Sequence, residues 1–284
     1  MSVYAGSARV PAGACDCHMH IFGPTERHAP ITEADYVPAD ALYEDYIALR
    51  LSLGLSRTVV VQPSIYGLDH ACTAEAVERL GESGRGVAVL APDVHDSEIE
   101  YLHSIGFRGI RFNLVNSGGV AADAFETMAA RVAEYCWHVQ VMVTGDAIAS
   151  LAPRLAGLPV DVVIDHMGRF DAIAEAEPAG FRSLLSLLEG GRCWVKLSGA
   201  YRIDFGGAPW PMAAPLAKTL IAAAPERLVW GTDWPHPDLG TSPMPNDAAL
   251  LDALAAWTAK DALLQRILVD NPAALYDFAP EVGS

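Results

Sequence analysis

The chain has 284 residues, of which 51% are hydrophobic and 19% charged, so it can bury a large core. Its formal net charge of −16 repels phosphate backbones and anionic lipid headgroups, so we expect neither nucleic acid nor a membrane as partner. The five cysteines are an odd number without a CxxC pair, and no run has the character of a signal peptide or membrane span. We therefore expect a cytoplasmic protein with reduced thiols.

Short apolar runs alternate with Ala/Leu-rich stretches of helical period along the whole chain. The predicted strands are Ala14–His18, Thr58–Ser64, Gly86–Pro92, Phe107–Leu114, His138–Thr144, Asp161–Met167, Cys193–Gly199 and Arg227–Trp234. The predicted helices are Ala39–Leu53, His70–Gly81, Ser97–Ser104, Ala122–Trp137, Ala147–Leu155, Pro178–Glu189, Pro211–Ala224, Asp247–Ala259 and Asp261–Val269. Eight successive strand–helix units predict an α/β protein with a (β/α)8 TIM barrel. No linker interrupts them, so we expect residues 1–284 to form a single domain.

Polar residues gather at the carboxyl ends of the predicted strands, where the active sites of TIM barrels lie. They are Asp16, His18, His20, Gln62, Ser64, Arg111, Asn113, Thr144, Asp146, Asp165, His166, Lys196, Ser198, Arg202, Asp233 and His236. The opposite ends of the same strands are mostly apolar or small. The sequence therefore predicts an active site where the loops that follow the strands converge.

The first predicted strand leads into the hexapeptide CDCHMH, residues 15–20. In a regular strand alternate side chains share a face, so Asp16, His18 and His20 are expected to point together into the barrel. The sulfur-bearing residues between them are expected to face the helices, and a mixed Cys/His zinc site is therefore not expected. Two histidines in step near a strand end favour an active site over ordinary packing.

The segments CDCHMHIFGP, DHMGR and WGTDWPHP resemble the amidohydrolase superfamily, in its branch of 2-pyrone-4,6-dicarboxylate lactonase and related sugar-acid and muconolactone lactonases. The segments VVVQPS, GFRGIRFNLV, VKLSGAYR and LVDNPAALY extend the resemblance over essentially the whole chain. It implies a barrel in which a first-strand HxH pair, a sixth-strand histidine and an eighth-strand aspartate surround a lactone carbonyl. The residues at those positions are His18, His20, His166 and Asp233.

Lactone hydrolysis needs these residue types. Asp233 is the predicted general base for the attacking water. Imidazole N–H groups of His18, His20 and His166 are predicted to stabilise the negative charge on the carbonyl oxygen, directly or through a bound cation. The same four residues would suit one Zn²⁺ or Mn²⁺ ion. The resembled branch is notable for metal-independent hydrolysis, so we expect no required cofactor and keep one divalent ion as the alternative.

Two arginines are candidate substrate ligands. Arg111 and Arg202 lie near predicted strand ends, and an inward arginine needs an anionic partner. A carboxylate on the substrate would supply it. The alternative is that both arginines pair with internal acids such as Asp16 or Asp165.

Further substrate contacts follow from the resemblance and from the eighth loop. The resemblance implies contacts by Tyr36 and Ser64, and Asp238 is a weaker candidate. The segment NSGGV after RFNLV lacks a basic residue of the dicarboxylate lactonase, and Met142 replaces a tyrosine contact. A lactone with one acidic group, or a sugar-acid lactone, is therefore as compatible as a planar dicarboxylate.

We accordingly expect a hydrolase that opens a small anionic lactone. The alternatives are a zinc-dependent nonoxidative decarboxylase of the same superfamily, a sugar-acid lactone isomerase, and a barrel that only binds or serves as a scaffold. No GxSxG, GxxxxGK[ST] or GxGxxG motif supports serine-hydrolase, phosphate-loop or dinucleotide chemistry. Assembly as a homo-oligomer is left open.

Overall fold

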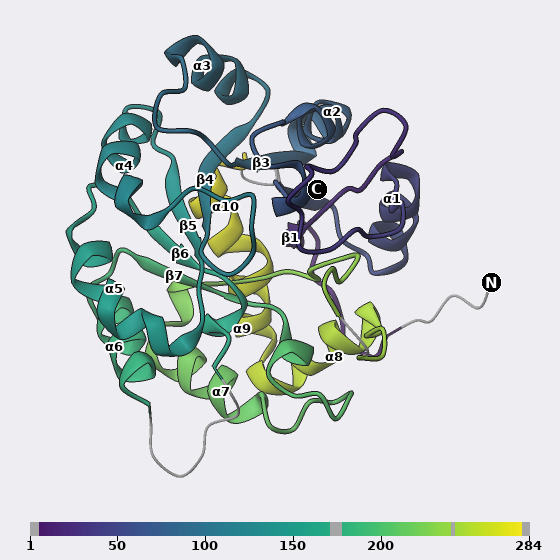
Figure 1. The fold of residues 1–284 in the computed structure, drawn as a ribbon. Helices are drawn as coiled ribbons and strands as arrows, with labels where there is room; N and C mark the ends of the chain where they lie inside the picture. The colour runs from purple at the N-terminus through teal and green to yellow at the C-terminus, as the bar shows by residue number, and fades with distance from the viewer. Residues whose placement is uncertain (1–5, 171–177, 240–241, 280–284) are drawn as a thin grey trace.

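The structure, a computed structural model, describes residues 6–170, 178–239 and 242–279. Its strands form one parallel sheet in which each strand pairs with its neighbour along the chain (Figure 1). The strands are β1 (Cys15–Met19), β2 (Arg57–Val61), β3 (Gly84–Ala88), β4 (Phe107–Asn113), β5 (His138–Met142), β6 (Val162–Ile164), β7 (Cys193–Leu197) and β8 (Leu228–Trp230). The predicted barrel fold is confirmed. The predicted single domain spans residues 1–284, beyond the described residues, and stays a prediction.

Helices surround the sheet and bury its outer face (Figure 1). They are α1 (Tyr43–Ser52), α2 (Ala71–Leu80), α3 (Asp96–Ser104), α4 (Phe125–Ala133), α5 (Gly145–Gly157), α6 (Ala179–Glu189), α7 (Ala214–Ala223), α8 (Asp247–Thr258), α9 (Asp261–Gln265) and α10 (Asn271–Tyr276), with a π-helical turn at Arg266–Asp270. Within the described residues, no helix has the length and apolar character that crossing a bilayer requires.

Seven of the eight strands end earlier than predicted, and after two of them the backbone turns sharply. β6 ends at Ile164 instead of Met167, since His166 and Met167 have φ values of 51° and 53°. β8 ends at Trp230, and Asp233, with a φ of 63°, lies in the segment that follows. Positive φ values are rare for residues with a side chain, and they end the extended conformation.

The barrel closes where the segment after β8 returns to β1. The backbone N–H of Asp233 donates to the carbonyl oxygen of His18 at 2.7 Å. The N–H of His20 donates to the carbonyl oxygen of Trp234 at 2.8 Å. The segment that carries Asp233 is therefore held against the segment that carries both first-strand histidines.

An extra residue interrupts the regular pairing of β1 with β2. Asp16 pairs with Thr58, whereas the next recorded pair joins Met19 to Val60. Three steps along β1 thus correspond to two steps along β2. This is the register shift of a β-bulge, which turns the side chains that follow it to the opposite face.

The bulge contradicts the alternation expected for residues 15–20. Cys15 and Cys17 belong to a cluster in the barrel interior, which we call the interior cluster. Its other members are Val59, Val61, Val87, Val163, Trp194, Val229, Tyr276 and Phe278. Asp16 faces outward, where Tyr46 of α1 donates to its carboxylate at 3.1 Å. His18 nevertheless points inward, because the extra residue reverses the alternation before it.

We predict that Gly231→Ala destabilises the closure of the barrel. A Cβ at this position would lie 2.5 Å from the backbone nitrogen of His18 and 2.7 Å from its Cβ. Overpacking of this kind should lower the free energy of unfolding by roughly 1–3 kcal/mol, measured by urea denaturation. Gly157→Ala is the matched control, since nothing lies within 4 Å of its added Cβ. Equal stability of both variants would contradict the prediction.

Candidate active site

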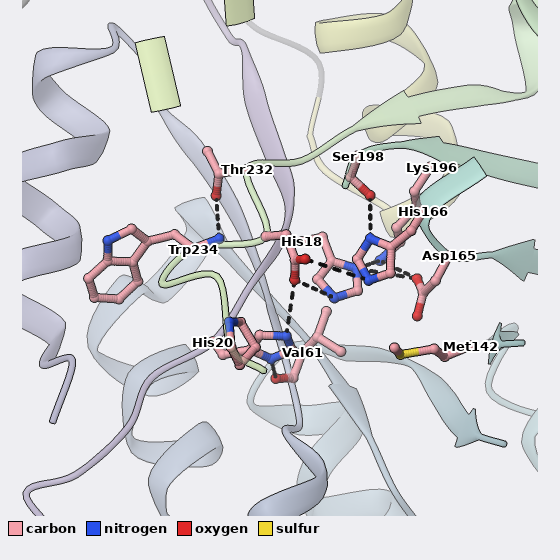
Figure 2. A network of polar contacts seen from close by, with 12 residues as sticks. His18, His20, Val61, Met142, Asp165, His166, Lys196, Ser198, Thr232 and Trp234 are labelled. Atoms are coloured by element: carbon pink, nitrogen blue, oxygen red, sulfur yellow. Dashed lines mark hydrogen bonds and ion pairs between the residues drawn. The ribbon is translucent and has the colours of Figure 1, made fainter. Parts of the chain in front are cut away.

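The rings of His18, His20 and His166 lie close together (Figure 2), and the carboxylate of Asp233 faces all three. Asp233 Oδ1 lies 3.7 Å from His18 Nε2 and 3.6 Å from His20 Nε2. Its other oxygen, Oδ2, lies 3.8 Å from His166 Nε2. The structure therefore brings the four predicted catalytic residues together, and all four are buried.

Hydrogen bonds on the far side of two rings fix their orientation. His20 Nδ1 lies 2.7 Å from the carbonyl oxygen of Val61. A carbonyl oxygen only accepts, so Nδ1 carries the proton, and Nε2 of the neutral ring is an acceptor that faces Asp233. His166 Nδ1 lies 2.9 Å from the hydroxyl of Ser198, which can donate or accept.

Burial favours the neutral form of all three imidazoles. Burial lowers the pKa of His18 well below its ordinary value and lowers the pKa of His20 as well. For His166, burial lowers the pKa to about 3. Neutral rings can each offer one N–H group and one lone pair, which suits both oxyanion stabilisation and metal ligation.

Asp233 is held as a carboxylate with one oxygen left free. Its Oδ2 accepts from Arg202 Nε at 2.8 Å and from the Tyr201 hydroxyl at 2.5 Å. Its Oδ1 is buried and has no hydrogen-bond partner among the described residues. Burial by itself raises the pKa of Asp233, but the guanidinium of Arg202 opposes burial, and the pKa lies well below its ordinary value.

A second buried carboxylate, Asp165, lies behind His18. Its Oδ2 accepts from Arg111 Nε and from Gln140 Nε2, both at 3.1 Å. Its Oδ1 lies 3.2 Å from His18 Nδ1. The alternative in which the arginines pair with internal acids therefore describes this structure. Arg111 pairs with Asp165, and Arg202 pairs with Asp233, the predicted general base.

Lys196, one of the polar residues at the predicted strand ends, lies in the same buried network. Its Nζ donates to the carbonyl oxygen of Cys17 and to Gln140 Oε1, both at 2.8 Å. It also lies 3.3 Å from His18 Nδ1. Burial lowers its pKa to about 8, so the group is mainly cationic at neutral pH.

The predicted substrate contacts divide into two groups. Tyr36 and Ser64 lie near the buried cluster: burial raises the pKa of Tyr36, while a hydrogen bond to Ser64 and the charge of Arg111 oppose the increase. Asp238 is exposed and accepts from Asn116 Nδ2 at 3.3 Å.

Arg169 is a cation for which we predicted no role, although it ends the segment DHMGR. It is half-buried, and its Nη1 is buried without a hydrogen-bond partner among the described residues. Burial and the charge of Arg202 lower its pKa. In the sequence, Arg169 could have been singled out because it follows His166 by three residues. The neighbouring residues do not show, however, whether an internal acid pairs with this arginine.

The donor atoms would suit one divalent cation in type and spacing. One ligand atom each from His18, His166 and Asp233 lies within 4.8 Å of the others. His20 is outside this group, although its Nε2 lies 3.6 Å from Asp233 Oδ1. Imidazole and carboxylate ligands are those that Zn²⁺ and Mn²⁺ accept.

Asp16 fixes the position of the Asp233 segment. Its carboxylate accepts from the Thr232 N–H at 3.0 Å and from the Thr232 hydroxyl at 2.6 Å. It also accepts from Tyr46 and from the N–H of His18, both at 3.1 Å. The outward aspartate of the first strand therefore joins the two segments of the site instead of lining it.

The chain matches the family model described as amidohydrolase over residues 15–278. It is 37% identical to a 4-sulfomuconolactone hydrolase of Hydrogenophaga intermedia, covering 94% of this chain and 89% of the relative. It is 35% identical to a 2-pyrone-4,6-dicarboxylate hydrolase of Comamonas testosteroni, with coverages of 94% and 91%. It is 29% identical to a D-galactarolactone isomerase of Agrobacterium fabrum, with coverages of 99% and 96%.

The fold also matches solved structures. A ligand-free crystal structure of an Agrobacterium tumefaciens protein superposes with a TM-score of 0.88 and 30% sequence identity. The match covers 97% of this chain and all of that protein. The resemblance found in the sequence is therefore confirmed at the level of the whole barrel.

We predict that Thr232→Val weakens the link between Asp16 and the Asp233 segment. The variant removes the hydroxyl that donates to Asp16 at 2.6 Å and accepts from the Trp234 N–H at 3.0 Å. A lost partner of a buried carboxylate should lower the free energy of unfolding by about 1–3 kcal/mol in urea denaturation.

Thr219→Val is the control for this prediction. The Thr219 hydroxyl donates to the carbonyl oxygen of Pro215 within α7, at an exposed position. Its removal should change the free energy of unfolding by at most about 0.5 kcal/mol. A Thr232 variant as stable as this control would show that the link is not needed.

Proposed function

The chain belongs to the amidohydrolase family, and we propose that it opens the ring of a small anionic lactone by hydrolysis. The observation that carries the proposal is the free oxygen of Asp233, which is buried and faces His18 and His20 at 3.7 and 3.6 Å. Two hydrolases at 37% and 35% identity are named for lactone or pyrone substrates, which supports the reaction type.

Asp233 activates water in this proposal. A water molecule between Asp233 Oδ1 and His20 Nε2 meets two acceptors, since His20 donates its only proton to Val61. The carboxylate takes a proton as the water oxygen attacks the lactone carbonyl carbon. The same proton then passes to the ring oxygen as the C–O bond breaks.

His18 and His166 stabilise the oxyanion. Their Nε2 atoms face Asp233 from two sides of the barrel, and His18 Nε2 has no hydrogen-bond partner among the described residues. An N–H group that is fixed before the reaction stabilises developing charge without reorganisation. The predicted N–H role of His20 is replaced by an acceptor role, because its Nδ1 faces a carbonyl oxygen.

The substrate carries an acidic group in this proposal. Arg111 and Arg202 are each neutralised by a buried carboxylate, whereas Arg169 has an Nη1 atom without a partner among the described residues. A substrate carboxylate or sulfonate would satisfy Arg169. Tyr36 and Ser64 would contact the same ligand from the β1 and β2 loops, and Asp238 would lie at the rim.

We also propose that hydrolysis requires no metal ion. His18, His166 and Asp233, with His20 beside them, would hold a divalent ion, which would polarise the carbonyl. The surrounding charge opposes the binding of such an ion. The two buried carboxylates, Asp165 and Asp233, already face three cations, Arg111, Lys196 and Arg202.

A lactone isomerase is the second candidate, favoured by the isomerase relative that covers 96% of its own length. The same carboxylate would then act on a sugar-acid lactone without net addition of water. The two reactions differ in their products, which NMR distinguishes.

We predict that a panel of anionic lactones contains a substrate whose hydrolysis depends on Asp233. Asp233→Asn keeps the size of the side chain but removes the base, so kcat should fall by about 10²–10⁴-fold. The release of protons is followed with a pH indicator, and the products are identified by NMR.

Asp261→Asn, at an exposed carboxylate that begins α9, is the control and should hydrolyse the same lactone at the wild-type rate. An Asp233→Asn enzyme as active as this control would contradict the assignment of the base. An isomerised ring as the product would replace hydrolysis by the second candidate.

Removal of metal provides a separate test. We predict that prolonged dialysis against a strong chelator leaves the rate of lactone hydrolysis unchanged while elemental analysis shows no bound metal, because the imidazole N–H groups themselves stabilise the oxyanion. Loss of hydrolysis that returns with Zn²⁺ or Mn²⁺ would contradict the metal-independent mechanism. Release of CO2 from an aromatic or muconate acid, abolished by the chelator, would instead indicate the decarboxylase.

A further inference from the structure

We propose that Lys196 is a positioning residue that fixes the proton of His18 on Nε2, the nitrogen that faces the reaction centre. The inference rests on the proposed function for its catalytic meaning, but the position of the proton can be observed without any substrate. Lys196 does not contact the lactone in this proposal, and it acts through the ring of His18.

The surroundings of Lys196 account for all of its protons. Its side chain is fully buried, and an ammonium group has three N–H donors and no lone pair. Three acceptors lie within hydrogen-bond distance of Nζ: the carbonyl oxygen of Cys17 at 2.8 Å, Gln140 Oε1 at 2.8 Å and His18 Nδ1 at 3.3 Å. A fourth, Asp165 Oδ1, lies at 3.8 Å, beyond hydrogen-bond distance. The oxygen atoms of Cys17 and Gln140 can only accept, so they take two of the three ammonium protons. The third proton is therefore directed to His18 Nδ1.

A second neighbour competes for the same ring nitrogen. Asp165 Oδ1 lies 3.2 Å from His18 Nδ1 and would favour a proton there. Asp165 Oδ1 makes no hydrogen bond among the described residues, whereas Lys196 Nζ lies within hydrogen-bond distance of Nδ1. The other oxygen of Asp165 is already satisfied by Arg111 and Gln140. The geometry therefore makes Nδ1 an acceptor from Lys196, and the neutral ring carries its proton on Nε2.

The β-bulge in β1 creates this arrangement. Cys17 and His18 are consecutive residues, yet the carbonyl oxygen of Cys17 and the ring of His18 both reach the ammonium group of Lys196. The register shift lies between Asp16 and Met19, which includes both residues. The ammonium group of Lys196 thus binds a backbone carbonyl and an imidazole ring within the bulge.

The position of the proton decides what His18 can do. With the proton on Nε2, the ring can donate to a carbonyl oxygen that becomes negative during the attack. With the proton on Nδ1, a lone pair would face that oxygen. Loss of one preorganised donor lowers kcat by about 10²–10³-fold, and substrate binding in the ground state should change much less.

Nuclear magnetic resonance of the protein with ¹⁵N-labelled histidine tests the inference. The ring nitrogens of His18, assigned by comparison with His18→Gln, should show a protonated Nε2 and an unprotonated Nδ1. In Lys196→Met, which keeps the length and removes the cation, the proton should move to Nδ1 and toward Asp165. Lys218→Met, at an exposed position on α7, is the matched control and should leave the spectrum unchanged.

Kinetics add a readout that a merely structural role would not produce. In Lys196→Met, kcat should fall by about 10²-fold with little change in KM, because only the interaction with the oxyanion is lost. Lys196→Ala leaves space for a small amine, so added methylammonium should restore both the Nε2 proton and part of kcat. Lys196→Met, whose side chain fills that space, should not respond.

A proton on Nδ1 of His18 in the wild-type protein would overturn the inference, even if no Lys196 variant folds. An unchanged tautomer in a folded Lys196→Met protein would overturn it as well. These results are distinct from failure of the proposed function. A protein with the expected tautomer that hydrolyses no lactone would contradict only the function. An active enzyme with a proton on Nδ1 would contradict the role of Lys196 and the N–H role of His18, but not lactone hydrolysis itself.

Discussion

One extra residue in the first strand determines how the site is assembled. Because β1 gains a residue between its pairs with Thr58 and Val60, Asp16 faces the helices while His18 faces the interior. An aspartate on the outer side can then bind Thr232, next to Asp233, without placing another charge beside the base. A regular strand would have put Asp16 below the histidines, where it would compete for the cations that neutralise the two interior carboxylates.

Those interior carboxylates show how a charged site is tolerated inside a barrel. Asp165 is bound by Arg111 and Gln140, and Asp233 by Arg202 and Tyr201. Burial alone would favour the protonated acids, but the charges of Arg111 and Lys196 near Asp165 and of Arg202 beside Asp233 keep both ionised. His18 lies between the two, and its ring is the only polar side chain in contact with both among the described residues. The groups that contact the His18 ring therefore matter as much for its chemistry as the position of the ring in the site.

The parts of this architecture that could be predicted are those with a repeating pattern. Parallel strands buried on both faces are continuous apolar runs, which is why the eight strands and the polar ends could be identified. The bulge could not be predicted, because an extra residue changes the alternation without changing the composition of CDCHMH. The acids that pair with the arginines could not be predicted either. Arg111 and Asp165 lie 54 residues apart and meet only when β4 and β6 curve into one barrel.

The connection between Asp16 and Thr232 spans 216 residues of the chain. The base and the histidines therefore share one location only after the last strand segment has reached the first. Contacts between such distant residues form late in folding because a long loop must close first. In a refolding experiment, the return of enzymatic turnover would accordingly report when the segment after β8 joins β1. The spectroscopic signal of the helices would report the earlier assembly of neighbouring strand–helix units.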